Sequence, residues 1–338
     1  MQTIFEIDAE RRTPKYLQIV HSVTKAIKQG RYKRGDRIFS INQLSNECLL
    51  SRDTVQKAYE VLERDRIIEA VRGKGFYVSR TDLVVPCKVL LVFNKLSTYK
   101  KIIYDSFVQT LGNKAFVELK IHHSSVKSLE QIIDTSLGLY DYYVIMPHFE
   151  HEHDILPILQ KIPGEQCMIL DKDLRAPHAC YKGVFQDFEQ DIVVALESGL
   201  DLLRKYNKLI YVQPAGICPP IEIMHGIRTF CQQYSFAFAI KPGIPLNEQL
   251  VKKEAYIVVD ETDLVNLVKS CLANSFSVGE DIGILSYNES PFKEILAGGI
   301  SVISTDHAKM GETAAKLILE NRPEKIKNPF ALVRRKSL

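Results

Sequence analysis

Short apolar segments alternate with amphipathic ones from Lys88 onward, and this alternation limits the possible folds more than any other feature of the sequence. Strands are predicted at residues 89–93, 116–122, 142–146, 167–170, 184–185, 209–212, 236–240, 256–259, 282–286 and 302–303. Helices are predicted at residues 188–206, 221–234, 264–273 and 307–319. Strands that alternate with helices in this way form parallel sheets with helices on both faces. We therefore expect residues 88–338 to form an α/β domain.

Polar residues follow most of these strands, at the positions where parallel sheets bind ligands. They are Asn94, Lys95, His148, Asp171, Lys172, Gln186, Asp187, Asp260, Glu261, Asn288, Glu289, Thr305 and Asp306. Carboxylates and amides around a cleft exchange hydrogen bonds with several hydroxyls at once, which is what a neutral sugar requires. For Asp187, Asp260 and Asp306 the alternative is to cap the helix that follows, and one side chain can do both.

The stretch from Ser40 to Ser79 predicts a helix-turn-helix closed by a wing. Ser40 and Ser51 are each expected to cap a helix. Both helices have apolar residues at helical spacing, Ile41, Leu44 and Cys48 in the first and Val55, Ala58, Tyr59 and Leu62 in the second. Two short strands at residues 67–71 and 76–78 follow, and Arg72-Gly73-Lys74-Gly75 joins them in a tight turn.

The first turn of the second helix has the composition of a DNA-reading element. Its unpaired backbone N–H groups favour a phosphate, and short hydroxyls with Arg and Gln reach base edges in a major groove. The residues predicted to read the major groove are Ser51, Arg52, Thr54 and Gln56. Arg37 and Asn42 are predicted to hold phosphates. Arg72, Gly73 and Lys74 are predicted to place the wing on the DNA. The alternative for each part alone is an ordinary helix pair or hairpin, but their succession is more specific than either.

The net charge of +3 is unevenly distributed along the chain. Residues 1–80 contain 16 Lys and Arg against 10 Asp and Glu, a net charge of +6, and the remainder contains 28 against 31, a net charge of −3. The positive charge therefore lies on the predicted DNA-binding segment, as attraction to a phosphate backbone requires.

Residues 14–79 resemble the winged helix-turn-helix of the GntR family of bacterial transcription regulators. The resemblance depends on the first-helix segment 14–29, the segment 30–38, the motif Ser51-Arg-Asp-Thr-Val55 and the wing motif Gly73-Lys-Gly-Phe76. Phe39 stands where the family usually has a small residue or Leu before a Pro-Ser pair, and Gln56 stands where Arg is common. The resemblance implies a sequence-specific DNA-binding head, and the departure at Gln56 leaves the sequence of its half-site open.

Residues 88–338 resemble the sugar-binding domain of LacI-type repressors and periplasmic sugar-binding proteins, most clearly in segments 279–291 and 300–319. This implies two similar subdomains, joined by crossing strands, that close over an effector held by Asp171, Asp260, Asn288 and Thr305. Ile223 stands where many members have an Arg that clamps ring hydroxyls, and His148 or Lys95 is expected to replace it. The candidate effector-binding residues are Asn94, Lys95, His148, Asp171, Asp187, Asp260, Asn288 and Thr305.

The predicted fold class is an N-terminal winged helix-turn-helix (α+β) followed by an α/β periplasmic-binding-protein-like domain of two Rossmann-like subdomains. The predicted boundaries are residues 1–80 for the head, 81–87 for a linker and 88–338 for the effector-binding and dimerisation domain. Pro86 interrupts the backbone just before the first apolar strand, which favours a linker there. A head and domain of these two types together are similar to the arabinose-operon repressors and the regulators of fucose use.

The cysteines and the apolar segments predict a cytoplasmic protein. The seven cysteines form no CxxC pair and no regular framework, so they are expected to be reduced. No apolar run approaches the ~20 residues of a membrane span, and the first residues lack the pattern of a signal peptide. We expect no contact with a membrane.

Three other motifs suggest different chemistry. The histidines and carboxylates of Met146–Asp154 could hold zinc, but they form no i, i+4 helical pair and have no Cys partner, so no metal or cofactor is expected. His122-His123-Ser124-Ser125 suggests nucleophilic catalysis, but without a GxSxG elbow we predict no enzyme. The segment Arg334-Arg335-Lys336 is either a nucleic-acid patch or a frayed, solvated tail.

These patterns together predict a transcription regulator that represses a carbohydrate-use operon. It would bind a near-palindromic operator as a homodimer and respond to a sugar such as L-fucose or L-arabinose. The alternative is a constitutive DNA binder whose large domain only dimerises or binds a protein partner.

Overall fold

The computed structural model describes residues 7, 13–81, 86–149, 152–174, 181–214 and 219–338. The chain divides into two compact units, one of residues 1–89, 113–118 and 131–141 and the other of residues 90–112, 119–130 and 142–338. Within the described ranges, no helix is long and apolar enough to cross a membrane. The domain boundaries at residues 80 and 88 stay predictions, and residues 82–85 of the predicted linker lie outside the described ranges.

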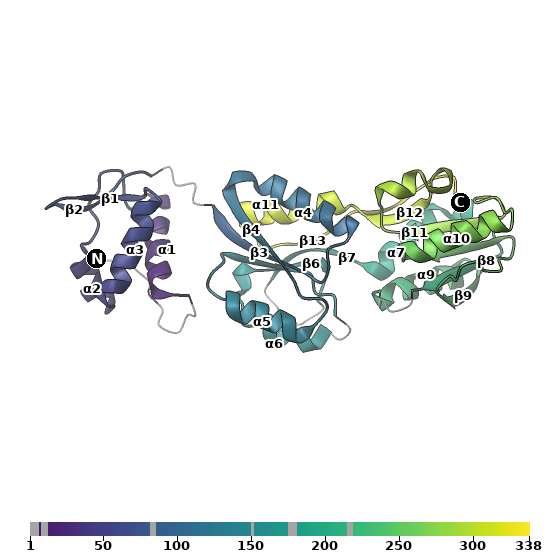
Figure 1. Cartoon of the computed structure of the whole chain (residues 1–338), viewed down its shortest axis with the longest axis horizontal. Coiled ribbons are helices and arrows are strands. Elements are labelled where there is room, and N and C mark those ends of the chain that lie inside the picture. The colour runs from purple at the N-terminus through teal and green to yellow at the C-terminus, as the bar shows by residue number, and fades with distance from the viewer. Residues whose placement is uncertain (1–6, 8–12, 82–85, 150–151, 175–180, 215–218) are drawn as a thin grey trace. The chain divides into compact units, whose positions relative to one another are not determined.

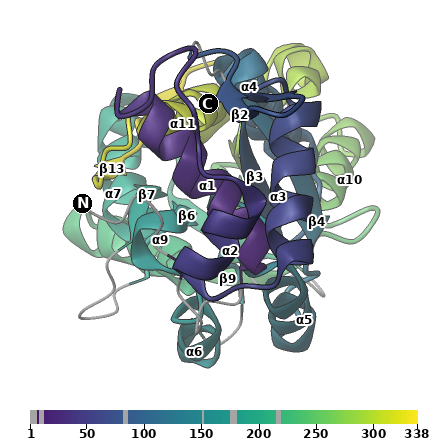
Figure 2. The same ribbon diagram turned by 90° about the vertical axis from the view of Figure 1, so that its left-hand side faces the viewer.

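The head is a three-helix bundle with a β-hairpin (Figure 2). Its elements are α1 (Lys15–Lys28), α2 (Ile41–Cys48), α3 (Arg52–Arg64), β1 (Ile68–Val71) and β2 (Gly75–Val78). Residues from all three helices and the hairpin form one core, which includes Ile19, Leu44, Tyr59 and Val78. The Tyr59 hydroxyl donates a hydrogen bond of 2.6 Å to the carbonyl of Phe39, so the segment before α2 is tied to α3.

The turn between α2 and α3 follows from local signals in the sequence. Ser40 begins α2 with a capping box, because its Oγ accepts from Gln43 N at 3.3 Å and Gln43 Oε1 accepts from Ser40 N at 2.9 Å. Leu49 ends α2 in the left-handed region at φ 52°, and Ser51 caps α3 by accepting from Thr54 N at 3.2 Å. The predicted helix-turn-helix is thus confirmed in detail.

The first lobe of the large domain has a six-stranded sheet in the order β13-β7-β6-β5-β3-β4. Its strands are β3 (Cys87–Phe93), β4 (Ala115–Ile121), β5 (Tyr142–Ile145), β6 (Cys167–Lys172), β7 (Lys182–Gln186) and β13 (Lys325–Lys327). Its helices are α4 (Thr98–Leu111), α5 (Val126–Ser136), α6 (Leu156–Leu159) and α11 (His307–Leu319). The strands β5, β6, β7 and β13 pair in parallel, which brings their carboxyl ends to one edge of the sheet.

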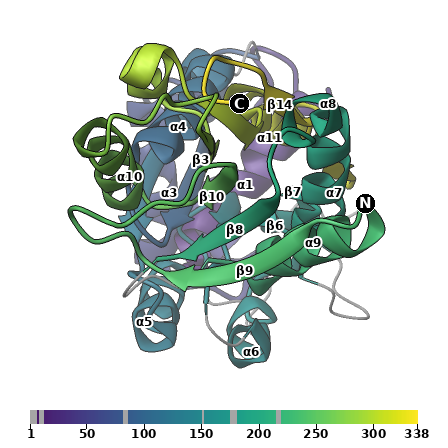
Figure 3. The same cartoon turned by 90° about the vertical axis from the view of Figure 1, so that its right-hand side faces the viewer.

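The second lobe has a six-stranded sheet in the order β14-β12-β11-β10-β8-β9 (Figures 1 and 3). Its strands are β8 (Lys208–Gln213), β9 (Ala237–Pro242), β10 (Glu254–Val258), β11 (Ile282–Tyr287), β12 (Ser301–Thr305) and β14 (Phe330–Val333). Its helices are α7 (Phe188–Ser198), α8 (Leu200–Leu203), α9 (Ile221–Gln233) and α10 (Glu261–Ala273). One core joins α7 and α9 to the sheet and a second core joins α10 to it, so both faces are covered.

The chain passes between the two lobes three times, after β7, after β12 and after β13. The second passage places α11, which follows a strand of the second lobe, against α4 of the first lobe. Gly311 allows this close approach, because a Cβ there would lie 2.4 Å from the carbonyl oxygen of Ile103. Where the second and third passages meet, Asn328 Nδ2 donates to Thr305 Oγ1 at 2.7 Å. The predicted fold class is therefore confirmed.

Several elements differ from the sequence prediction. The predicted helix 188–206 is broken at Gly199 into α7 and α8. Gly199 leaves room for Leu332, because a Cβ there would lie 2.5 Å from Leu332 Cδ2. The sheet of the second lobe is not wholly parallel, since β14 pairs antiparallel with β12. The predictions also missed α4, α5, β13 and β14. Of the two alternatives for Arg334–Lys336, the frayed, solvated tail is wrong, because Ser337 and Leu338, which follow this segment, are only 0% and 5% exposed.

Candidate functional site

The amino end of α3 presents polar side chains on the surface of the head. Ser51, Arg52 and Gln56 are exposed and Thr54 is half-buried. The Ser51 and Thr54 hydroxyls lie 2.8 Å apart, and Gln56 Nε2 donates to Glu60 Oε1 at 3.2 Å. The α3 residues Val55, Ala58 and Leu62 are fully buried, so the helix is anchored by one face and open along the other. This is the arrangement that a helix entering a major groove requires.

The wing carries cations at its tip, and Arg37 lies beside its second strand. Arg72, Gly73 and Lys74 are exposed, and Gly73 makes the turn with φ 74°. Arg37 pairs as a β-bridge with Tyr77, so the segment before α2 extends the hairpin, which the sequence did not predict. The Arg37 guanidinium lies beside Gly75, where a Cβ would be 3.3 Å from Nε. Arg37 and Asn42 are both exposed, so all nine predicted DNA contacts are at least partly accessible.

Asp171 is the centre of a polar cluster at the carboxyl ends of three strands of the first lobe. Its Oδ2 accepts from His148 Nε2 at 2.7 Å, and its Oδ1 accepts from Gln186 Nε2. Tyr287 at the end of β11 donates to Gln186 Oε1 at 3.3 Å, which extends the chain of hydrogen bonds into the second lobe. Asp171 is 3% exposed and has φ 78°, a backbone conformation that is uncommon outside glycine and asparagine.

The electrostatics of the cluster keep Asp171 ionised and His148 neutral. Burial by itself raises the pKa of Asp171, but the hydrogen bonds from His148 and Gln186 and the charge of Lys100 outweigh it and lower that pKa. Burial and the charge of Lys100 lower the pKa of His148. Burial also lowers the pKa of Lys100 to about 8, against the opposite effect of Asp171. Lys100 is 1% exposed and donates to Asn94 Oδ1. The cluster therefore contains both a buried cation, Lys100, and a buried anion, Asp171.

The second lobe contributes the loop after β11. Asn288 begins it in the left-handed region at φ 64°, and Lys293 donates to the carbonyls of Tyr287 and Asn288 at 2.9 and 2.7 Å. Among the described residues, the buried atoms Asn288 Oδ1 and Ser290 Oγ have no hydrogen-bond partner. Unpaired buried polar atoms are costly, so they mark places where a bound molecule would supply the missing hydrogen bonds.

His307, at the start of α11, lies near both groups of residues. Its ring lies 4.9 Å from that of Tyr99, and burial lowers its pKa to about 4, with smaller effects from Asp171, Lys293 and Lys100. Its Nε2 is buried and has no partner in the part of the chain that the structure describes. His307 therefore offers a neutral nitrogen close to the cluster around Asp171.

The remaining predicted effector residues have visible structural roles. Asp187 caps α7 by accepting from Gln190 N at 3.4 Å, and Asp260 caps α10 by accepting from Thr262 N at 2.8 Å. Thr305 is 2% exposed and its hydroxyl is committed to Asn328 and Pro329. Lys95 is exposed, and its charge helps to lower the pKa of Lys100. The structure thus brings Asn94, Lys95, His148 and Asp171 together and places Asn288 in the second lobe.

Four residues of the cluster were missed by the sequence prediction, Tyr99, Lys100, Lys293 and His307. A signal existed for Lys100, because it shares helical spacing with the apolar Ile103 and Phe107 and so stands at a core position of α4. The described residues contain no group of His, Cys, Asp and Glu side chains suited to a metal. In the segment Met146–Asp154, where no zinc site is expected, Glu150 and His151 lie outside the described ranges, and His148 donates to Asp171.

Two family models match the chain. The model of bacterial regulatory proteins of the gntR family matches residues 15–78. The model of the periplasmic binding protein-like domain matches residues 220–338.

Three curated relatives come from Bacillus subtilis and Geobacillus stearothermophilus. The HTH-type transcriptional repressor YtrA of Bacillus subtilis is 32% identical over 126 residues, which are 37% of this chain and 92% of that repressor. The HTH-type transcriptional regulator TreR of the same organism is 25% identical over 193 residues, 54% of this chain and 71% of the regulator. The arabinose metabolism transcriptional repressor of Geobacillus stearothermophilus is 34% identical over 71 residues, 21% of this chain and 20% of that repressor.

Solved structures of similar fold include a dimeric Lac repressor and a LacI family regulator. The Lac repressor dimer matches with a TM-score of 0.62 and 14% identity, over 74% of this chain and 98% of that chain. A LacI family transcriptional regulator from Enterococcus faecalis with bound ribose matches with a TM-score of 0.58 and 17% identity, over 74% of this chain and 98% of that chain. At these identities the likeness establishes the fold of the large domain.

Proposed function

The chain belongs to the gntR family of bacterial regulatory proteins and is a DNA-binding transcription regulator, and we propose that a sugar bound between the two lobes controls its affinity for DNA. The observation that carries the proposal is the polar cluster around Asp171, which reaches the second lobe through Gln186 and Tyr287 and lies near the unpaired atoms of Asn288 and His307.

The proposed DNA contacts lie on the exposed side of α3 and on the wing. Ser51, Arg52, Thr54 and Gln56 would read base edges, and Arg37 and Asn42 would hold phosphates. Arg72, Gly73 and Lys74 would place the wing beside them. The exposure of these side chains and the net charge of +6 on residues 1–80 support this assignment.

The proposed sugar contacts combine charged, donor and acceptor groups from both lobes. Asp171, His148, Asn94 and Lys95 would come from the first lobe, and Asn288 from the second. The candidates Asp187, Asp260 and Thr305 stay part of the proposal, although each already makes the structural contacts described above. Because ring hydroxyls both donate and accept, they can satisfy Asn288 Oδ1 and His307 Nε2 at the same time.

The class of sugar is suggested by the relatives and the fold neighbours. One relative regulates arabinose metabolism and one fold neighbour binds ribose. We propose a small sugar such as L-arabinose or L-fucose. Sugar would close the two lobes and change the spacing of paired heads in a homodimer, so that it releases a near-palindromic operator. The fold likeness to a dimeric Lac repressor supports the dimer.

A thermal-shift screen tests the proposal directly. The full chain is heated with L-arabinose, L-fucose, D-ribose, trehalose or lactose at micromolar to millimolar concentration. At least one sugar is expected to raise the Tm, because a ligand that binds only the folded state stabilises it. A flat screen would instead favour a constitutive DNA binder whose large domain only dimerises or binds a protein partner. Chemical turnover of a bound sugar would indicate an enzyme.

A further inference from the structure

The C-terminal segment of the chain is built into the second lobe. Ser337 Oγ donates to the carbonyl of Ile284 at 2.6 Å and accepts from Ser301 N at 2.7 Å. Gly279 permits this passage, because a Cβ there would lie 2.0 Å from the carbonyl oxygen of Lys336. The segment that follows β14 is therefore held by hydrogen bonds to both β11 and β12.

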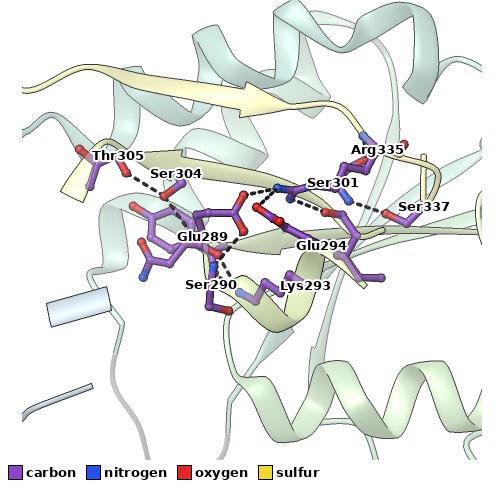
Figure 4. A network of polar contacts seen from close by, with 12 residues as sticks. Glu289, Ser290, Lys293, Glu294, Ser301, Ser304, Thr305, Arg335 and Ser337 are labelled. Atoms are coloured by element: carbon purple, nitrogen blue, oxygen red, sulfur yellow. Dashed lines mark hydrogen bonds and ion pairs between the residues drawn. The ribbon is translucent and has the colours of Figure 1, made fainter. Parts of the chain in front are cut away.

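Arg335 extends from this segment to the loop that follows β11 (Figure 4). Its guanidinium donates to Glu289 Oε2 at 2.7 Å, to the carbonyl of Ile300 at 2.9 Å and to Glu294 Oε1 at 3.5 Å. The Arg335 side chain is 17% exposed and that of Glu289 is 28% exposed. An ion pair with this degree of burial and several hydrogen bonds is screened less than a surface pair.

Other bonds fix the backbone of the same loop, as Figure 4 shows. Glu289 N donates to Ser304 Oγ at 3.0 Å, and Ser290 N donates to Glu289 Oε1 at 2.9 Å. The Lys293 ammonium, 2% exposed, binds the carbonyls of Tyr287 and Asn288. The Glu289 carboxylate thus joins two parts of the lobe: Oε2 accepts from Arg335 of the C-terminal segment, and Oε1 accepts from the loop backbone at Ser290 N.

Two side-chain atoms of the same loop lack hydrogen-bond partners within the described part of the chain. Asn288 Oδ1 and Ser290 Oγ are buried and, as far as the described residues extend, unpaired. These atoms flank Glu289 in sequence, so the direction in which they point depends on how the Glu289 backbone is held. A loop whose backbone is held by hydrogen bonds while neighbouring side chains are unpaired is suited to receiving a ligand.

We propose that Arg335 is a positioning residue for effector recognition: by holding the Glu289 carboxylate, it keeps Asn288 and Ser290 in the orientation that accepts a sugar hydroxyl. The inference rests on the proposed function, because it assigns a role to a loop of the proposed sugar site. The C-terminal segment would then influence which sugar the site binds, without contact between Arg335 and the sugar.

The neighbouring Arg334 provides a matched control. Its side chain is 50% exposed and donates to Asp201 Oδ2 at 2.9 Å and to the carbonyl of Ser198. The two arginines therefore share charge, size and position in the chain but bind different elements, α8 and α7 for Arg334 and the effector loop for Arg335.

The experiment compares R335Q, R334Q, R335K and E289Q in the full-length chain. Binding of L-arabinose and of any other sugar found in the screen is measured by calorimetry, and amide hydrogen exchange is followed for residues 288–295. R335Q and E289Q are expected to weaken sugar binding about tenfold and to speed exchange in this loop. R335K should restore part of both properties, and R334Q should match the wild type. E289Q breaks the same ion pair without altering the C-terminal segment, so it decides the matter if R335Q fails to fold.

Wild-type exchange in residues 288–295 together with wild-type affinity in R335Q and E289Q would overturn the inference. A loss of affinity that R334Q shares equally would do the same, because it would indicate a general effect of charge. If the wild type binds no sugar, the proposed function fails by itself. The exchange measurement then decides alone whether Arg335 holds the loop, and unchanged exchange rejects it.

Discussion

His148 Nε2 lies 2.7 Å from Asp171 Oδ2, so the end of β5 is joined to the end of β6 by a hydrogen bond between a neutral imidazole and a buried carboxylate. The other oxygen of Asp171 accepts from Gln186, which in turn accepts from Tyr287 of the second lobe. Asp171 therefore sets the orientation of polar groups on both sides of the proposed sugar site.

Replacing Asp171 by Asn tests this role. The amide cannot accept from both His148 and Gln186, and Lys100 loses the nearby negative charge, so we expect sugar binding to weaken at least tenfold and the large domain to lose ~1–3 kcal/mol of stability. Isothermal calorimetry and chemical unfolding measure the two effects. Asp173→Asn is the control, because this carboxylate pairs with Lys325 at 3.1 Å and does not join the cluster. Equal losses in both variants would contradict the role of Asp171.

Arg52→Ala is expected to cost ~1–3 kcal/mol of preference for the operator over random DNA, because a side chain at the amino end of α3 reaches base edges. Fluorescence anisotropy with both DNAs measures the preference, and sugar binding should not change. Arg64→Ala is the control, since Arg64 ends the same helix and its side chain is 71% exposed beside Asp65. If Arg52→Ala lost affinity equally for both DNAs, Arg52 would be a phosphate contact.

The stability of the large domain is expected to fall as the pH is lowered from about 6.5 to 4. Burial lowers the pKa of His122 and of His307 from 6.5 to about 4, so between these values the unfolded chain binds protons that the folded chain does not. Each histidine then contributes a slope of up to ~1.4 kcal/mol per pH unit, with stability rising as pH rises.

Unfolding of the wild type and of His307→Gln across this pH range measures the slope. The variant should show a shallower dependence, since it has lost one of the histidines whose pKa burial lowers. Burial is the main reason why the pKa of His122 is lowered. Its Nδ1 also accepts from Ser124 N at 3.1 Å, a hydrogen bond that requires the neutral ring. Stability that stays constant from pH 6.5 to 4 would contradict this account.

Gly311→Ala is expected to destabilise the large domain by ~1–3 kcal/mol. The new Cβ would lie 2.4 Å from the carbonyl oxygen of Ile103 and 2.9 Å from the amide nitrogen of Phe107, so α11 would have to move away from α4. Lys309→Ala, on the solvent face of the same helix with a side chain 47% exposed, should stay within about 0.5 kcal/mol of the wild type. Similar Tm values for the two variants would contradict this prediction, because they would show that α11 can move away from α4 without loss of stability.

The head was predictable from the sequence because its signals are local. The caps at Ser40 and Ser51, the helical spacing of apolar residues and the glycines of the wing each determine structure within a few residues. The β-bridge at Arg37 was missed because its pairing with Tyr77 joins positions far apart in the sequence, and a single paired residue has no periodicity.

The large domain was predictable as a class but not in its long-range contacts. Buried parallel strands are recognisable as apolar runs, whereas the short β13 and β14 are half exposed and give no such signal. The ends of strands located His148, Asp171 and Asn288, but no local pattern places Lys293 beneath the backbone of Asn288 or Arg335 beside Glu289. The Arg335 contact forms only after the second and third passages between the lobes bring the C-terminal segment back to the loop after β11.

We propose that the bound sugar lowers the affinity of the protein for its operator, and that the bound operator lowers its affinity for the sugar. The most direct measurement is the operator Kd with and without a saturating sugar from the screen, together with the sugar Kd with and without saturating operator, using an operator selected from random DNA. We predict that sugar raises the operator Kd at least fivefold and that operator raises the sugar Kd by the same factor, because such coupling is reciprocal. An operator Kd that no bound sugar changes would contradict the claim.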